Sequence, residues 1–225
     1  MTTAPTSTPV VTWPREEPAP AGVVMLAQAE WPASARDDLP PIPGFIVSSF
    51  SPLVVEVARR CLSLYFGTAP ADPVRGERTA VVLASSTGDI TTAAAIAKAV
   101  DEGRRVQPLL FFQSNPNASV GYLTARWGLA GPVVCTVPGG DAMSDARHCA
   151  TLLIEGGDAD AVLIILADQA RDPTQRDHGV ALLIGPRSWS AAAVGKGSAV
   201  GKGAAVGKGA AVGEGAAAML DFPAG

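Results

Sequence analysis

The stretch WGLAGPVVCTVPGGDAMSDARHCATLLIEGGDADAVLIIL, residues 127–166, decides the fold. It predicts a strand at 133–137, a helix at 142–155 that stops at Gly156-Gly157, and a second strand at 161–166. The second strand is apolar on both faces, as strands are when helices cover both sides of a largely parallel sheet. This stretch therefore predicts a strand–helix–strand unit within a layered domain.

The sequence on either side continues the alternation of strand and helix. Three further apolar runs predict strands, at 22–27, 79–84 and 179–184. Helical spacing of apolar residues predicts three further helices, from Pro52 to about Gly67 with Ser51 as its cap, over 89–100 and over 118–127. We expect an α/β fold, with a mixed, mostly parallel five-stranded sheet and helices on both faces.

Composition divides the chain into three parts. Residues 1–20 are rich in proline and lack periodicity, which predicts a flexible N-terminal arm. Residues 21–187 carry the predicted strands and helices and form one domain. Residues 188–225 contain four copies of a six-residue unit, (Ala/Ser)-Ala-Val-Gly-(Lys/Glu)-Gly, beginning at Ala192. One valine and two glycines per unit cannot bury an apolar face, which predicts a low-complexity tail.

Charge and cysteine content exclude several classes of protein. The 225 residues include 17 basic and 21 acidic ones, a net charge of −4, so we expect no nucleic-acid partner, which would need a basic patch. Three cysteines without a C-x-x-C pair argue against a disulfide scaffold and favour a cytoplasmic location. No apolar run is long enough to span a bilayer and no basic start leads into an apolar stretch, so we expect no membrane association and no secretory signal.

Five short motifs occur in a characteristic order along the chain. They are TAVVLASSTGD (79–89), FQSNPNASVG (112–121), WGLAGP (127–132), GDADA (157–161) and HGVALLI (178–184). Together they resemble the N-terminal half of a β-ketoacyl synthase, a condensing enzyme of the thiolase-like superfamily. The resemblance implies a thiolase-like half-fold and a role connected with acyl-chain elongation.

The nucleophile of these synthases is missing at its expected position. In the family, a cysteine lies eight residues after the Gly-Pro turn, at a helix N-terminus where the helix dipole and backbone amides favour the thiolate. Counting from Pro132 places Gly140 at this nucleophile-equivalent position. The two catalytic histidines of the family belong to a C-terminal half that has no counterpart in residues 188–225. The resemblance therefore implies a chain without catalytic residues.

Cys135 is the alternative nucleophile, five residues before the expected position and inside a predicted strand. A buried cysteine in an apolar strand usually packs as a small hydrophobic residue whose pKa is not lowered. The two histidines, His148 and His178, are far apart and match no metal-binding spacing. We therefore expect no metal and no cofactor.

The resemblance also implies a protein partner. Family members pair edge to edge through the strand that corresponds to 133–137, and an unpartnered edge of this apolar composition would favour aggregation. The partner would be a full-length ketosynthase or a second copy of this chain. The expected interface residues are Phe111, Phe112, Asn117, Val133, Val134, Cys135, Thr136 and Val137.

An acyl carrier protein is a further expected partner. An acidic carrier would dock on basic residues of this chain. The candidates are Arg59, Arg60, Arg104, Arg105, Arg126 and Arg147.

These features lead to one hypothesis with two alternatives. The chain is expected to be a catalytically inactive, ketosynthase-like accessory subunit, a pseudoenzyme similar to a chain length factor, in bacterial polyketide, polyene or fatty-acid-type biosynthesis. It would form a heterodimer with an active ketosynthase. One alternative is an acyl hydrolase or transferase that uses Cys135 or a serine on the half-thiolase scaffold. The other is a homodimeric acyl-binding module.

Overall fold

The computed structural model describes residues 22–172 and 174–193. Its strands are β1 (Val23–Trp31), β2 (Thr79–Ala84), β3 (Val133–Thr136), β4 (Ala161–Asp168) and β5 (His178–Pro186). Its helices are α1 (Phe50–Phe66), α2 (Pro73–Glu77), α3 (Ile90–Asp101), α4 (Pro108–Gln113), α5 (Pro116–Trp127), α6 (Ala142–Glu155) and α7 (Arg187–Ala193). The predicted N-terminal arm lies outside the described residues, as does the predicted tail beyond Ala193.

The five strands form one mixed sheet in the order β1-β5-β4-β2-β3. β2 pairs in parallel with both β3 and β4, whereas β5 runs antiparallel to both β4 and β1. The α/β fold and the mixed sheet are confirmed, although only two of the four pairings are parallel. The reason lies between β4 and β5, where residues 169–177 are too few for the crossover of about a dozen residues that a parallel pairing needs.

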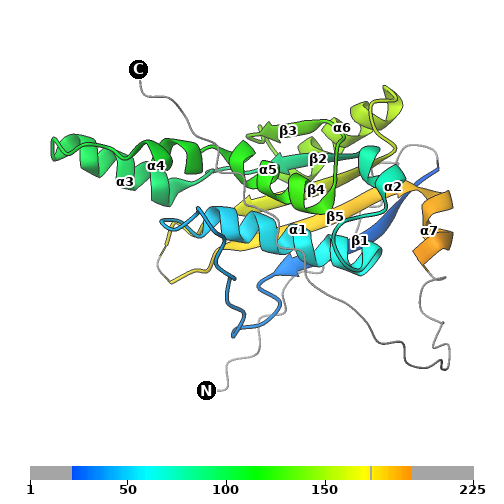
Figure 1. The fold of residues 1–225 in the computed structure, drawn as a ribbon, viewed down its shortest axis with the longest axis horizontal. Coiled ribbons are helices and arrows are strands. Elements are labelled where there is room, and N and C mark those ends of the chain that lie inside the picture. The colour runs from blue at the N-terminus through cyan, green and yellow to red at the C-terminus, as the bar shows by residue number, and fades with distance from the viewer. Residues whose placement is uncertain (1–21, 173, 194–225) are drawn as a thin grey trace, which may run out of the picture.

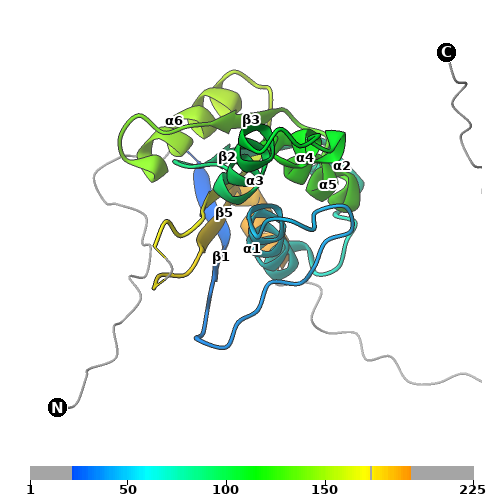
Figure 2. The same ribbon diagram turned by 90° about the vertical axis from the view of Figure 1, so that its left-hand side faces the viewer.

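Helices cover both faces of the sheet, as expected (Figure 2). Side chains along β2 alternate between the two faces: Val81 and Leu83 pack beneath α1 and α5, whereas Ala80 and Val82 pack beneath α6. The same alternation continues in β4 and β5, so the sheet separates two apolar cores. The strands at the centre of the sheet are therefore buried on both sides, which explains why they read as continuous apolar runs.

Helix α1 begins at Phe50, two residues earlier than the sequence indicates. Its N-cap is Ser49 rather than Ser51, and Ser51 lies buried inside the first turn. The Ser49 hydroxyl makes no cap hydrogen bond and donates instead to the carboxylate of Asp177, in the loop before β5. The long-range hydrogen bond has replaced the local cap that Ser51 was predicted to supply.

Helices α3 and α4 project from one end of the sheet (Figure 1). Asp89 caps α3 by accepting a hydrogen bond from the Thr92 N–H at 2.9 Å. The Thr91 N–H donates to Gln169 Oε1, and the Gln113 side chain donates to the Gly44 carbonyl, so both ends of this projection are fixed to the body. No helix in the described part of the chain combines the length and the apolar character that a bilayer crossing requires.

Candidate functional site

The junction between β3 and α6 contains Gly140, the position at which the resemblance to β-ketoacyl synthases led us to expect a nucleophile. Asp141 caps α6 by accepting a hydrogen bond from the Ser144 N–H at 2.7 Å. The N–H groups of Gly139 and Gly140 both donate to Asp145 Oδ2, at 2.7 and 3.2 Å. Gly140 is exposed, and a Cβ added to it would meet no atom within 4 Å. The junction therefore has room for a side chain, and the chain provides none.

The carboxylate of Asp145 changes what this junction can do chemically. Backbone N–H groups at a helix N-terminus attract anions and form oxyanion holes when they point at a reacting carbonyl. Here the Gly139 and Gly140 N–H groups bond a carboxylate of the same chain. A developing oxyanion would have to displace that carboxylate before it could accept these two hydrogen bonds.

A cavity of about 300 Å³ lies beside this junction, at the carboxyl ends of β2 and β3. Its wall includes Ser85, Cys135 and Val137. The Ser85 hydroxyl is already committed, because it donates to Asp168 Oδ1 and accepts from the Gly88 N–H, both at 2.9 Å. Asp168 Oδ1 also accepts from the N–H groups of Ser86 and Thr87, so it fixes the turn that follows β2. Ser85 is thus an anchor of this turn.

Cys135 is the thiol on the cavity wall, and its surroundings do not activate it. Burial raises its pKa above the ordinary value for a cysteine. Its Sγ lies 3.0 Å from Asn117 Oδ1, to which the thiol donates a hydrogen bond. Because the thiolate is the nucleophilic form, a raised pKa makes Cys135 a poor nucleophile at neutral pH. Within the described residues, no group of three or more His, Cys, Asp or Glu side chains could hold a metal ion.

β3 forms one edge of the sheet in the described structure. It pairs with β2 alone, through hydrogen bonds such as those from the Val81 N–H to Pro132 O and from the Ser85 N–H to Thr136 O. Since backbone groups alternate along a strand, the N–H and C=O groups of Val133 and Cys135 face away from β2. The Val133 side chain is 44% exposed and that of Val137 is 74% exposed. The edge is therefore open and partly apolar.

The predicted interface residues near this edge do not all lie on the same side of the sheet. Asn117 joins α5 to β3 through Cys135, and both Asn117 and Phe112 line a neighbouring apolar cleft of about 530 Å³. Phe45 and Tyr122 also line that cleft, where the Phe45 ring contacts the rings of Phe112 and Tyr122. Val134 lies apart from this group, because it packs against the α6 side of the sheet.

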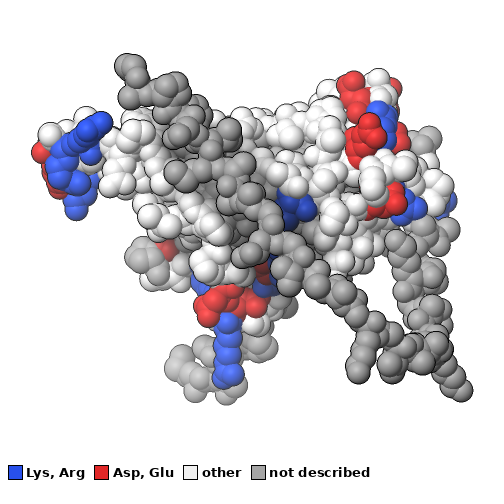
Figure 3. Space-filling model, viewed as in Figure 1, with Lys and Arg blue, Asp and Glu red and all other residues white. Residues whose placement is uncertain are grey.

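Charged side chains are sparse over much of this face of the molecule (Figure 3). Charges of both signs gather at the end of the α3–α4 projection, where Lys98 and Arg104 pair with Glu102 and Arg105 lies nearby. Arg147 was expected among the surface cations that face an acyl carrier protein, but its side chain lies buried on α6, 4% exposed. Helical spacing alone does not decide which face of α6 carries Arg147, and the packing of this helix buries the side chain.

The sequence analysis did not single out Asp145 and Asp168, the two carboxylates that hold the loops at this site. Asp145 had a signal, since an acidic residue in the first turn of α6 is a common way to satisfy free N–H groups there. Asp168 had no such signal, because it lies two residues beyond the predicted end of its strand at 166. Its role depends on the turn after β2, which is distant in sequence.

Comparison with known proteins identifies the family. The family model described as "beta-ketoacyl synthase, N-terminal domain" matches residues 22–191. No curated protein sequence matches the chain. Among solved structures, one match is a chain from the complex of the Xenorhabdus doucetiae ketosynthase ApeO with its chain length factor ApeC. The two chains are 18% identical, and the match covers 73% of this chain and 79% of the other, with a TM-score of 0.56.

Two further solved structures share the fold. A β-ketoacyl synthase from Burkholderia phymatum STM815 is 18% identical over 72% of this chain, with a TM-score of 0.57. The ishigamide ketosynthase/chain length factor is 18% identical over 65% of this chain, with a TM-score of 0.51. The match covers 48% and 49% of those two chains, so this protein spans about half their length. The chain belongs to the beta-ketoacyl synthase N-terminal domain family and has the thiolase-like fold of a ketosynthase half-domain.

Proposed function

We propose that this protein is a catalytically inactive accessory subunit that partners an active ketosynthase, in the manner of a chain length factor. The pathway would be bacterial polyketide, polyene or fatty-acid-type biosynthesis. Family membership and the likeness to structures of ketosynthases with chain length factors support this assignment. The interior of a bacterial cell, where such pathways run, would be its location.

The β3–α6 junction is the observation that carries the proposal. Gly140 offers no group to acylate, and Asp145 accepts the hydrogen bonds of the amides that would stabilise an oxyanion. Cys135, the nearest thiol on the cavity wall, has a raised pKa. A protein with this site can contribute to condensation through a partner's nucleophile rather than its own.

The open edge of β3 is the proposed contact with the partner. Pairing across this edge would satisfy the outward backbone groups of Val133 and Cys135 and cover the exposed Val133 and Val137 side chains. Phe111 and Phe112, both exposed on α4, would lie beside the contact. The cleft lined by Phe112 and Asn117 is apolar enough to border an acyl chain that grows on the partner.

Co-expression with a full-length ketosynthase from the same genome tests the proposal. We expect the tagged chain to co-purify with that synthase and to accept no radiolabelled acyl group itself. Val133→Lys places a charge on the edge and should weaken the complex at least tenfold, equivalent to about 1.4 kcal/mol. Val74→Lys is the matched control, because Val74 is an exposed valine on α2, outside the sheet. Equal loss in both variants, or none in either, would contradict the proposed interface.

Acyl transfer by the purified chain separates the proposal from the hydrolase or transferase alternative. Transfer that disappears in Cys135→Ala would establish an enzyme with a cysteine nucleophile and reject the inactive subunit. A chain that forms homodimers through β3 and binds acyl groups, while the synthase is fully active alone, would instead establish the homodimeric acyl-binding module.

A further inference from the structure

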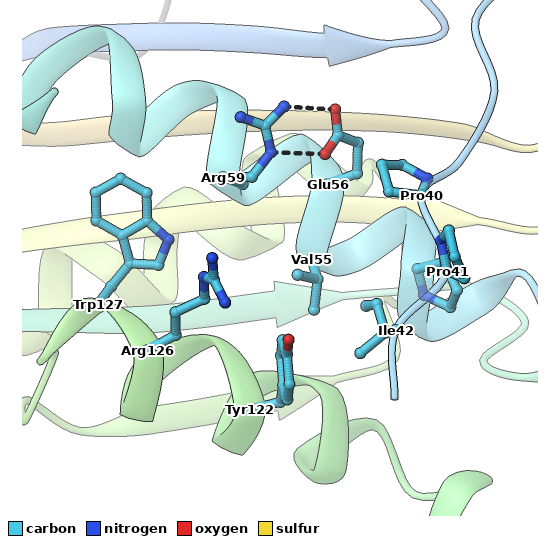
Figure 4. Close-up of a pocket in the computed structure, with 10 residues that line it drawn as sticks. Pro40, Pro41, Ile42, Val55, Glu56, Arg59, Tyr122, Arg126 and Trp127 are labelled. Carbon is cyan, nitrogen blue, oxygen red and sulfur yellow. Dashed lines mark hydrogen bonds and ion pairs between the residues drawn. The ribbon is translucent and has the colours of Figure 1, made fainter. Parts of the chain in front are cut away.

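A second cavity lies on the opposite side of β2 and β4 from α6, among α1, α5 and the loop at residues 40–42 (Figure 4). Its volume is about 200 Å³. Pro41, Ile42 and Val55 supply apolar wall, whereas Arg126 and Trp127 come from the last turn of α5. It shares only Tyr122 with the cleft near β3, so it is a separate site.

The indole of Trp127 gives this cavity an unsatisfied hydrogen-bond donor. Trp127 is 2% exposed, and its Nε1–H has no hydrogen-bond partner within the described residues. Figure 4 shows the indole nitrogen on the side of the ring that faces the other lining residues. A buried N–H without an acceptor is unfavourable, so an acceptor placed beside it would be favoured.

The charges around the cavity leave one net positive charge. Glu56 receives hydrogen bonds from both Arg59 and Arg60, and Arg60 also pairs with Asp37, so these four groups are neutral together. Burial alone would raise the pKa of Glu56, but the two arginines outweigh it and hold that pKa below its usual value. Glu56 is therefore ionised and already paired. Arg126 makes no ion pair or hydrogen bond with the described residues, and it supplies the remaining charge.

We propose that this cavity binds a small organic monocarboxylate. The carboxylate accepts hydrogen bonds from the Trp127 indole and the Arg126 guanidinium, while its apolar body lies against Pro41, Ile42 and Val55. The volume is below the ~300–1,000 Å³ of pockets that hold drug-sized ligands, so a short acid fits and a long acyl chain does not. This inference does not depend on the proposed partnership with a ketosynthase.

Titration of the full-length chain with benzoate tests the inference by NMR of the indole N–H groups. We expect the Trp127 resonance, assigned by its loss in Trp127→Phe, to shift on binding at millimolar benzoate. The Trp31 indole is an internal control, because its Nε1–H is also buried and unpartnered but does not line this cavity. Its resonance should stay in place.

Two matched comparisons isolate the role of charge. Arg126→Gln should weaken benzoate binding at least tenfold, whereas Arg105→Gln, which removes an exposed arginine from the α3–α4 projection, should leave it unchanged. Benzamide, which has the same ring without the charge, should bind at least tenfold more weakly than benzoate. A Trp127 resonance that does not move, equal binding of benzamide, or equal effects of the two arginine variants would each overturn the inference.

Discussion

Replacement of Gly140 by cysteine tests whether the β3–α6 junction favours an anion such as a thiolate. The substitution should fold normally, because Gly140 is exposed, its φ lies outside the left-handed region, and a Cβ there meets no atom within 4 Å. Removing a glycine also reduces the conformational freedom of the unfolded chain. We therefore expect the free energy of unfolding to change by less than about 1 kcal/mol.

The introduced thiol should have a pKa at or above the ordinary value. The helix dipole of α6 would lower it, by an effect worth about 0.3–1 kcal/mol at an exposed site. The Asp145 carboxylate opposes this: at roughly 5 Å in water, a like charge costs about 0.8 kcal/mol, a little over half a pKa unit. The two effects cancel, and a pKa near 8.5 leaves about 3% thiolate at pH 7.

The pH dependence of alkylation by iodoacetamide measures this pKa. The unsubstituted chain supplies the background, in which burial raises the pKa of Cys61 to about 12 and also raises that of Cys135. Gly139→Cys is the matched variant: its Cβ would lie 4.0 Å from Asp145 Oδ2, closer than that of Gly140, so its thiol should titrate at a higher pH. A thiol at position 140 with a pKa of 7 or lower, at least half ionised at pH 7, would refute the reasoning, because the junction would then retain a nucleophile-activating field.

Three further predictions concern stability, each measured by urea unfolding. Gly131→Ala should destabilise the fold by about 2–3 kcal/mol, because its Cβ would lie 2.5 Å from the Thr79 carbonyl oxygen. Gly140→Ala is the control and should change the stability little. Equal effects of the two substitutions would contradict the close approach of Gly131 to Thr79. Asp168→Ala should cost about 2–3 kcal/mol by leaving Ser85 and its neighbouring N–H groups unpaired, and Asp158→Ala, on an exposed turn, is the control. Because the folded-state pKa of Glu56 is lowered, its ionisation stabilises the fold above its unfolded pKa of about 4.3, and that contribution is lost as the pH falls through the folded value. Glu56→Gln should therefore lose less stability than the natural chain between pH 7 and about pH 3.5, and identical losses would count against this role.

The sequence predicted the centre of the fold because its strands are buried on both faces. The predicted bounds of β2 and α6 agree with the structure, and β4 begins where expected, since apolar runs and the Gly156-Gly157 stop leave little choice there. The predictions failed where tertiary contacts decide. α4 has only six residues, beginning at Pro108, which is too few for helical periodicity to be visible. α7 lies where a tail was expected to begin. The antiparallel direction of β5 follows from a short loop rather than from any pattern within the strand.

The candidate site was predictable in position but not in chemistry. Counting residues from Pro132 placed Gly140 at a strand-to-helix junction, where the structure has it. The sequence could not show that Asp145 turns back to bond the two glycine amides, because that contact depends on the path of the intervening loop. It likewise could not show that Trp127 is buried without an acceptor, since the GLAGP turn only indicates where α5 ends.

The contact between Asp145 and the glycine amides also bears on how such a protein can evolve. A thiol at position 140 would supply a reactive atom but leave a negative charge where the transition state needs a donor. Removing Asp145 alone would free the amides but destabilise the start of α6, with no gain in reactivity. A reactive junction would therefore need both changes together, because the bonds that keep the loop in place also occupy these amides.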